Sequence, residues 1–212
     1  MKFYDFRTAP SPKKVRLFIA EKGLEVPTVQ VDLRALAQQE PAFLARNPGA
    51  TVPVLELDDG TCLTESLAIC HYLERLQPEP NLMGADAREQ ALVLMWNDIL
   101  TFEGYLALQE SLRNGHEAFK GRALPGPVAY EQIPALAERG RRRAAIFFDR
   151  LETRLRESEF VAGGRFTYAD IVAYVYAGFA PRATGADPLE GRPALKEWGA
   201  AVAARPGIRS AG

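Results

Sequence analysis

The chain has 212 residues, of which 47% are hydrophobic and 25% charged, and its net charge is −1. Such values are ordinary for a globular protein, and the length allows one large domain or two small ones with a sizeable core. The balanced charge gives no electrostatic reason to expect a nucleic acid or an anionic membrane as partner. Cys62 and Cys70 are the only cysteines, too few for a disulfide framework.

The N-terminal stretch MKFYDFRTAPSPKK lacks the apolar core that a signal peptide needs. The longest helical apolar run, 171–180, has about half of the ~20 residues that span a bilayer. We therefore expect a soluble, cytoplasmic protein.

The first part of the chain alternates short β-like runs with amphipathic helices. The expected elements are, in chain order, a strand at 2–6, a helix at 13–22, a strand at 28–32, a short helix at 40–46, strands at 52–57 and 61–63, and a helix at 66–75. Gly23 would end the first helix, and Asp58-Asp59-Gly60 reads as a tight hairpin turn. This order predicts a small α/β sheet with helices packed against it.

Almost everything after residue 85 has a helical pattern. The expected helices are 86–114, 133–158, 171–179 and 192–205, with a loop at 121–128. Asp86 with Glu89, and Thr167 with Asp170, have the spacing of a helix capping box. Since the segment 78–85 is rich in proline, the sequence predicts a first domain at 1–77, a linker at 78–85 and an all-α domain at 86–212.

One hairpin carries two unusual features. Pro53 interrupts a buried strand, although proline cannot donate a hydrogen bond to a sheet. The polar pair Glu65-Ser66 stands where an apolar helix begins. Taken singly, these features are as well explained by the end of an edge strand and by an ordinary helix cap.

Together with their surroundings, these residues resemble the cytosolic glutathione transferase family, of a bacterial, serine-type kind. The likeness covers essentially the whole chain and rests on three motifs in order: Asn47-Pro48 leading to Val52-Pro53-Val54-Leu55, Leu63-Thr64-Glu65-Ser66-Leu67-Ala68-Ile69 with Tyr72-Leu73, and Phe166-Thr167-Tyr168-Ala169-Asp170. The resemblance implies a thioredoxin-like α/β N-terminal domain that binds glutathione and an all-α C-terminal domain that contributes the second-substrate site.

The resemblance also implies roles for the residues of the hairpin. The bond before Pro53 would be cis, which leaves the main chain of Val52 able to pair with the cysteinyl backbone of glutathione. Glu65 and Ser66 would hold the γ-glutamyl end, helped by the helix dipole. Gln38 lies where the family often has a polar contact to the glycyl carboxylate.

The family places the group that stabilises the glutathione thiolate between the first strand and the first helix. Ser11, expected just before that helix, is the leading candidate, with Thr8 and Tyr4 as rivals. The usual serine or cysteine position of the family falls on Ala9 when the helices are aligned. A thiol is missing from this loop, which disfavours disulfide reductase activity.

The second substrate would bind between the domains. An apolar pocket for it could be formed by Phe102, Tyr105, Tyr130, Tyr176 and Phe179, although each of these residues could equally be part of the core.

The expected function is a glutathione transferase that activates the thiolate to attack a small apolar electrophile or to reduce an organic peroxide, in the manner of a detoxification enzyme. Glutathione would be the co-substrate, with no metal, no nucleic acid and no membrane involved, and the protein would be a homodimer. The alternative is a binding module of the same fold with little or no catalysis. Ether or halide cleavage with glutathione would use the same residues, and the sequence does not distinguish it from the transferase reaction.

Overall fold

The computed structural model describes residues 1–211, and the chain divides into two compact units. The first unit contains residues 1–80, 125–128 and the segment from Pro206 onward. Its strands and α-helices are β1 (Lys2–Asp5), α1 (Pro10–Glu21), β2 (Thr28–Gln30), α2 (Pro41–Leu44), β3 (Val54–Glu56), β4 (Cys62–Thr64), α3 (Ser66–Leu76) and α9 (Pro206–Ala211).

The first unit is built on a four-stranded sheet with the order β2-β1-β3-β4. β1 runs parallel to β2 and antiparallel to β3, and β3 pairs antiparallel with β4. Because side chains alternate along a strand, Tyr4 and Val54 join Phe43 of α2 in a cluster on one face, whereas Phe3 and Leu55 are buried on the other. The α/β character expected of the N-terminal part is confirmed.

Helix α1 begins earlier than the sequence suggested. The expected start at Lys13 is wrong, because the helix begins at Pro10, whose fixed φ suits the first helical position. Ala9 is the N-cap and provides no side-chain cap. Ser11 therefore lies within the first turn of α1 and not in front of it.

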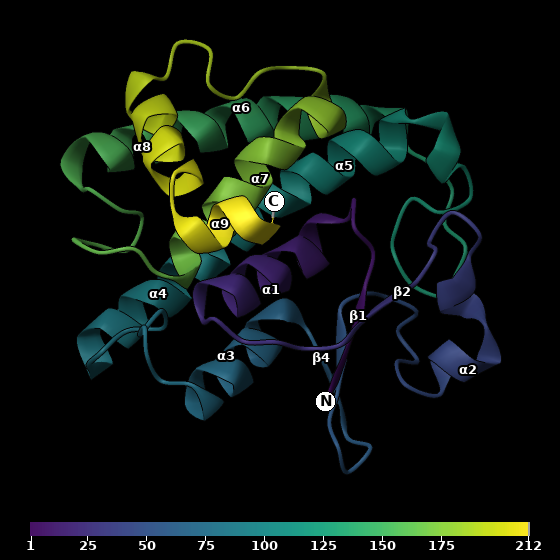
Figure 1. Ribbon diagram of the computed structural model, residues 1–212. Coiled ribbons are helices and arrows are strands. Elements are labelled where there is room, and N and C mark those ends of the chain that lie inside the picture. Colours follow the sequence, from purple (N-terminus) through teal and green to yellow (C-terminus); the bar gives the residue numbers. More distant parts are fainter. Residues whose placement is uncertain (212) are drawn as a thin grey trace. The chain divides into compact units, whose positions relative to one another are not determined.

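The second unit contains residues 81–124 and 129–205 and is helical. Its α-helices are α4 (Ala87–Ile99), α5 (Leu106–Gly115), α6 (Pro134–Glu157), α7 (Tyr168–Thr184) and α8 (Pro193–Ala203), with α5, α6 and α7 packed together (Figure 1). The only β pairing among its described residues is an isolated bridge between Arg122 and Tyr130. The all-α character expected of the C-terminal part is confirmed.

Helices α4 and α5 form one continuous helical stretch, joined by the π-helical segment Leu100–Tyr105. As expected, Asp86 caps its start by accepting from the backbone N–H of Glu89 at 2.8 Å. By length and by a mean hydropathy of 1.2, the stretch Ala87–Gly115 could cross a membrane, but a core helix meets the same criteria. Gly104 lies in the π-helical segment where a Cβ would come within 2.7 Å of the Phe147 ring, so the wider turn and the missing side chain together allow α6 to pack closely.

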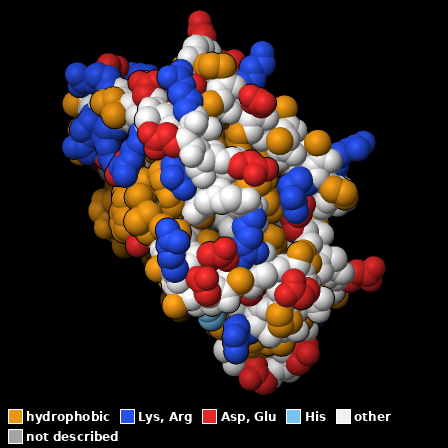
Figure 2. Space-filling model, turned by 90° about the vertical axis from the view of Figure 1, so that its left-hand side faces the viewer, with side chains coloured by type: hydrophobic (Ala, Val, Ile, Leu, Met, Phe, Trp, Pro, Cys, Tyr) orange, Lys and Arg blue, Asp and Glu red, His pale blue; other side chains and the backbone are white. Residues whose placement is uncertain are grey.

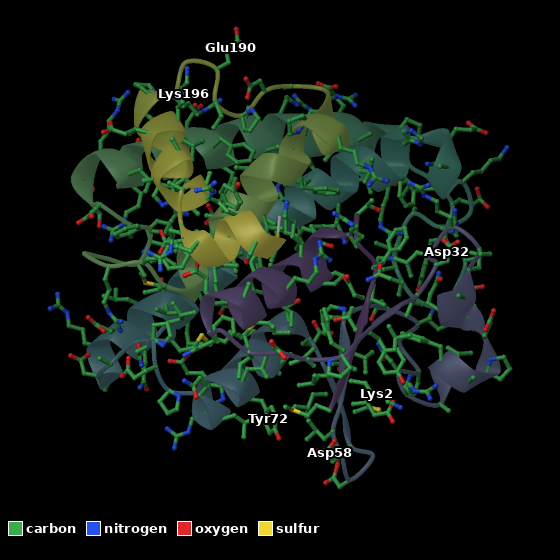
Figure 3. The ribbon with its side chains drawn as sticks, viewed as in Figure 1. Lys2, Asp32, Asp58, Tyr72, Glu190 and Lys196 are labelled. Atoms are coloured by element: carbon green, nitrogen blue, oxygen red, sulfur yellow. The ribbon has the colours of Figure 1, made fainter. Side chains whose placement is uncertain are left out.

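The two units of the structure differ in places from the domains expected at 1–77 and 86–212. The expected all-α domain at 86–212 included the segments 125–128 and 206–211, which group with the first unit; Gly212 lies outside the described residues. In the first unit the N-terminal ammonium of Met1 pairs with Asp58 at the tip of the β3–β4 hairpin, which is labelled in Figure 3. Helix α9 packs against α1, and Ile208 there is buried.

Candidate functional site

The first turns of α1 and α3 meet in the first unit. The Ser66 hydroxyl donates a hydrogen bond to the backbone carbonyl of Ser11 at 2.9 Å. Ser66 is buried and Ser11 is half-buried, so the contact fixes two of the expected site residues beside each other.

The N-terminus of α3 presents unpaired backbone donors. Its N-cap, Glu65, has φ +65° and ψ +121°, and no side chain caps the helix. The N–H groups of Ser66, Leu67 and Ala68 lie in the first turn, where a helix has no internal acceptors for them. The dipole of this 11-residue helix adds a partial positive charge at the same place. Because the backbone of Glu65 is in a strained region for a side-chain-bearing residue, the conformation points to a functional constraint.

Val52 lies at the end of the sheet, where the ladder stops. The last pair between β1 and β3 is Tyr4 with Val54, and the Val52–Pro53 peptide bond is cis. Among the described residues no backbone hydrogen bond involves the N–H or the carbonyl of Val52. Its main chain is therefore available to an added extended peptide.

A polar network supports the loop between β1 and α1. The buried Asp5 carboxylate accepts from Arg16 Nη1 at 2.5 Å and from Gln30 Nε2 at 2.7 Å. Arg16 also donates to the carbonyl of Arg7 at 2.8 Å, and Gln30 accepts from the Arg7 N–H at 3.0 Å. Since these contacts hold the backbone just before Thr8, they position the loop that carries this candidate donor and leads into the first turn of α1 with Ser11.

Tyr4, the third candidate donor, is directed elsewhere. Its hydroxyl donates to Glu56 at 2.6 Å, and the Arg46 guanidinium lies 5.1 Å from its ring centre while also binding Glu56. Burial, followed by the bond to Glu56, raises the pKa of Tyr4. Its ring belongs to the cluster with Phe43 on the α2 side of the sheet. The hydroxyl proton is thus engaged by a carboxylate within the first unit.

Two further predicted features lie in the first unit. Gln38, in the short 3₁₀ turn Ala37–Gln39, has a buried Oε1 atom without a hydrogen-bond partner. The Cys62 thiol has its pKa raised by burial and by Glu56, so it is protonated near neutral pH and is a weak nucleophile.

The aromatic residues expected around the second substrate are only partly gathered. Tyr105 stacks on Tyr176, with ring centres 5.0 Å apart and an interplanar angle of 9°. Phe102 is 60% exposed and Tyr130 46% exposed, and neither makes a ring contact with that pair. Phe179 is half-buried, one helical turn beyond Tyr176.

The network around Asp5 is not predictable from any local motif in the sequence. Its members are 11 and 25 residues apart in the chain, and no local motif joins them. The available signal was Asp5 itself, a carboxylate inside an otherwise apolar strand pattern, which is rarely buried without a partner.

Comparisons with known proteins identify the family of this chain. Residues 9–76 match the model for the N-terminal domain of glutathione S-transferases, and residues 116–206 match the model for the C-terminal domain. Glutathione S-transferase 2 of Saccharomyces cerevisiae is 33% identical over 99% of this chain and 88% of its own length.

Two crystal structures extend the likeness to three dimensions. A glutathione S-transferase domain-containing protein of Marinobacter aquaeolei VT8 is 37% identical with a TM-score of 0.89, covering 98% of this chain and 100% of its own. A glutathione S-transferase of class Gtt2 from Vibrio parahaemolyticus is 33% identical with a TM-score of 0.84, covering 100% of this chain and 97% of its own. The chain therefore belongs to the glutathione S-transferase family and is a glutathione transferase.

Proposed function

We propose that the protein binds glutathione in the first unit and activates its thiolate to attack a small apolar electrophile or to reduce an organic peroxide. The observation that carries the proposal is the meeting of Ser11 and Ser66 beside an uncapped helix N-terminus. An anionic, extended tripeptide suits this arrangement better than a neutral ligand does, because the helix end offers donors and a partial positive charge.

The γ-glutamyl carboxylate would bind at the start of α3. The N–H groups of its first turn supply the hydrogen bonds, and the exposed Glu65 carboxylate attracts the γ-glutamyl ammonium. The Ser66 hydroxyl already donates to the carbonyl of Ser11, so Ser66 would bind the carboxylate through its backbone N–H.

The cysteinyl and glycyl parts would follow the sheet edge. The N–H and carbonyl of Val52 pair with the cysteinyl backbone, as in the addition of a strand. Gln38 would meet the glycyl end, where its side-chain NH2 group can donate to a carboxylate.

The thiolate would be stabilised in the first turn of α1. Pro10 and Pro12 have no N–H, so Ser11 supplies both the amide and the hydroxyl of that turn. A hydrogen bond to a charged group is worth about 1.5–3 kcal/mol, equivalent to roughly one to two pKa units. Thr8 remains a rival because it is exposed on the neighbouring loop, and Tyr4 is the weaker rival because Glu56 accepts from its hydroxyl.

Two reactions share this thiolate. With a haloarene the sulfur forms a bond to carbon and the halide leaves. With an organic peroxide, two glutathione molecules are oxidised to the disulfide while the peroxide becomes an alcohol and water. The helical unit would supply the second-substrate pocket, with the half-buried Tyr105, backed by the fully buried Tyr176, as its apolar wall and Phe102, Tyr130 and Phe179 as further candidates.

Calorimetry with glutathione, followed by turnover of chlorodinitrobenzene and cumene hydroperoxide, tests this proposal. We expect binding, and conjugation or peroxide reduction that depends on glutathione. Binding without turnover of either compound would favour the alternative, a binding module of the same fold. A protein that does not bind glutathione at all would contradict both.

We also propose that the protein is a cytoplasmic homodimer that serves in detoxification. Hydrophobic side chains remain exposed on the helical unit, among them Leu94, Met95, Phe102 and Ile146, the last 68% exposed. Figure 2 shows hydrophobic side chains gathered beside a group of Lys and Arg side chains. A symmetric interface that includes α3 and α4 would cover apolar surface of this kind. Sedimentation should give twice the mass of the chain at micromolar concentration, and a stable monomer would contradict the proposal.

A further inference from the structure

Two arginines share one aromatic ring at the C-terminal end of α5. The Cζ atom of Arg113 lies 4.9 Å from the centre of the Phe119 ring, and that of Arg122 lies 5.9 Å from it. Arg113 lies in the last turn of α5, and Arg122 belongs to the loop that follows this helix (Figure 1). Both side chains are half-buried.

Neither arginine has an acidic partner among residues 1–211. The loop contains Glu117 and Glu131, but both are exposed and neither forms an ion pair with Arg113 or Arg122. Burial, and then the charge of Arg122, lower the pKa of Arg113, while Tyr105 acts in the opposite direction. Two positive charges are therefore held close together without a counter-charge, which is unfavourable unless an anion joins them.

The arginines of α6 show the contrast. Arg139 and Arg143 pair with Glu110, and Arg141 and Arg142 pair with Glu138. Arg154 of the same helix lacks an acidic partner among the described residues, but it shares the Trp96 ring with Arg150, which pairs with Glu103.

Most donors of the pair are unused. A guanidinium has five N–H donors, yet Arg113 donates to the carbonyl of Arg122 at 2.8 Å and Arg122 to that of Ala118 at 2.6 Å, with no further hydrogen bond from either side chain. The nitrogen atoms of these side chains that form no hydrogen bond are not buried, so a ligand can reach them. A planar carboxylate matches such a fork of donors in two places at once.

The pair continues a row that begins at the aromatic stack. Tyr105, Gln109 and Arg113 are spaced four residues apart and so lie on one side of the helix. Gln109 Nε2 donates to the Tyr105 hydroxyl at 2.6 Å, and Tyr105 stacks on Tyr176. A ligand along this row would meet the half-buried Tyr105 at one end and two cations at the other.

We propose that Arg113 and Arg122 bind the carboxylate of the second substrate, and that this enzyme therefore prefers apolar electrophiles carrying an acid group. This specificity rests on the proposed function, since the acid is recognised in the unit expected to hold the second substrate. In the reaction the thiolate forms a bond to the electrophilic carbon and displaces its leaving group, and the arginines take no part in bond making.

A matched pair of electrophiles tests the proposal. The two compounds are 4-chloro-3,5-dinitrobenzoate and 4-chloro-3,5-dinitrobenzamide, which both lose chloride but differ in charge. We expect Arg113→Gln to raise KM for the benzoate about tenfold or more and to leave KM for the benzamide within about twofold. Arg113→Lys should restore part of the loss. Arg141→Gln, which removes an exposed arginine that has a glutamate partner, is the control and should change neither KM.

Two results would overturn the proposal. One is an equal loss with both electrophiles in Arg113→Gln, which would make Arg113 a structural residue. The other is no change with either electrophile in both Arg113→Gln and Arg122→Gln. If these variants do not fold, calorimetry on the wild-type chain decides, because equal affinity for 3,5-dinitrobenzoate and 3,5-dinitrobenzamide also contradicts it. Binding of dinitrobenzoate that depends on Arg113, without turnover of either chloro compound, would refute the proposed transferase chemistry and leave the carboxylate site standing.

Discussion

Ser11 occupies an unusual first helical turn. Pro10 and Pro12 stand on either side of it and have no N–H. Among these first three residues of α1, Ser11 is therefore the one with a backbone N–H. If Ser11 stabilises the thiolate as proposed, the dipole of the 12-residue helix α1 would favour the same anion.

Ser11→Ala separates these two donors. If the hydroxyl stabilises the thiolate, the pKa of the bound thiol should rise by about one unit or more. Turnover of chlorodinitrobenzene should then fall near pH 7 and recover partly at higher pH, where the thiol ionises without help. The pH–rate profile is the measurement, with Thr8→Ala and Tyr4→Phe as comparisons. An unchanged profile in Ser11→Ala would assign the role to Thr8, Tyr4 or the backbone amide.

Glu65 offers a test of backbone strain. Glu65→Gly should relieve a conformation that costs about 1–3 kcal/mol, against about 0.4–1 kcal/mol lost to the greater freedom of glycine in the unfolded chain. We expect a higher melting temperature and weaker glutathione binding, because the carboxylate is gone. Glu65→Ala is the control: it should weaken binding similarly without the gain in stability. A glycine variant less stable than the alanine variant would show that the backbone is not strained.

Asp170 lies in the first turn of α7 and anchors the start of this helix. Its carboxylate is fully buried and accepts from the N–H of Thr167 at 2.9 Å, as the capping-box spacing predicted. It also accepts from the N–H of Val161 at 2.9 Å and from Trp198 Nε1 at 3.0 Å. One carboxylate thus joins the start of α7 to the preceding loop and to α8.

Asp170→Ala should therefore cost more than the loss of a cap alone. Three buried donors would lose their acceptor, each at about 1–3 kcal/mol, so we expect a loss of about 3 kcal/mol or more. Asp86→Ala, which removes an exposed cap from α4, should cost only about 0.5–2 kcal/mol. Denaturant titration of both variants measures the difference. Equal losses, or an unchanged melting point with lost activity in Asp170→Ala, would reverse the structural assignment.

Elements with local signals were predictable from the sequence. The capping pairs at Asp86 and Thr167 marked two helix starts because the donors and acceptors lie within one turn. The start of α1 was missed, since Pro10-Ser11-Pro12 reads as a loop although proline is well suited to a first turn. The π-helical segment could not be anticipated either, because it depends on the packing of Gly104 against Phe147 of α6.

The same distinction applies to the candidate site. Val52-Pro53 and Glu65-Ser66 are contiguous pairs, so the sequence could present them as candidates. The network around Asp5 and the arginine pair at Phe119 join residues through space, and their meaning depends on which side chains lack partners. Such information exists only in the folded chain.

In the molecule as a whole, each unit is built from segments that are separate in the sequence, and the first unit includes the segment from Pro206 onward. The close contact of α9 with α1 is set by Gly207, where a Cβ would come within 2.7 Å of the Glu21 side chain and 2.8 Å of its backbone. Ile208 then donates its N–H to Glu21 at 3.2 Å.

Gly207→Ala should destabilise the protein by about 1–3 kcal/mol, because the contact is already filled. Gly199→Ala is the matched control: nothing lies within 4 Å of its added Cβ in α8, and helix propensity should make it stabilising by about 0.5–1 kcal/mol. Denaturant titration measures both changes. A neutral or stabilising Gly207→Ala would show that α9 can shift away from α1.

The return of residues 206–211 to the first unit has a consequence for biosynthesis. A ribosome releases the chain from its N-terminal end, so the sheet and its first helices leave the exit tunnel long before the segment that completes them. Until Ile208 arrives, the α1 surface that it covers is exposed to solvent. A segment made after the whole helical unit thus completes the first unit, and a nascent chain halted within α8 would present that unit to chaperones unfinished.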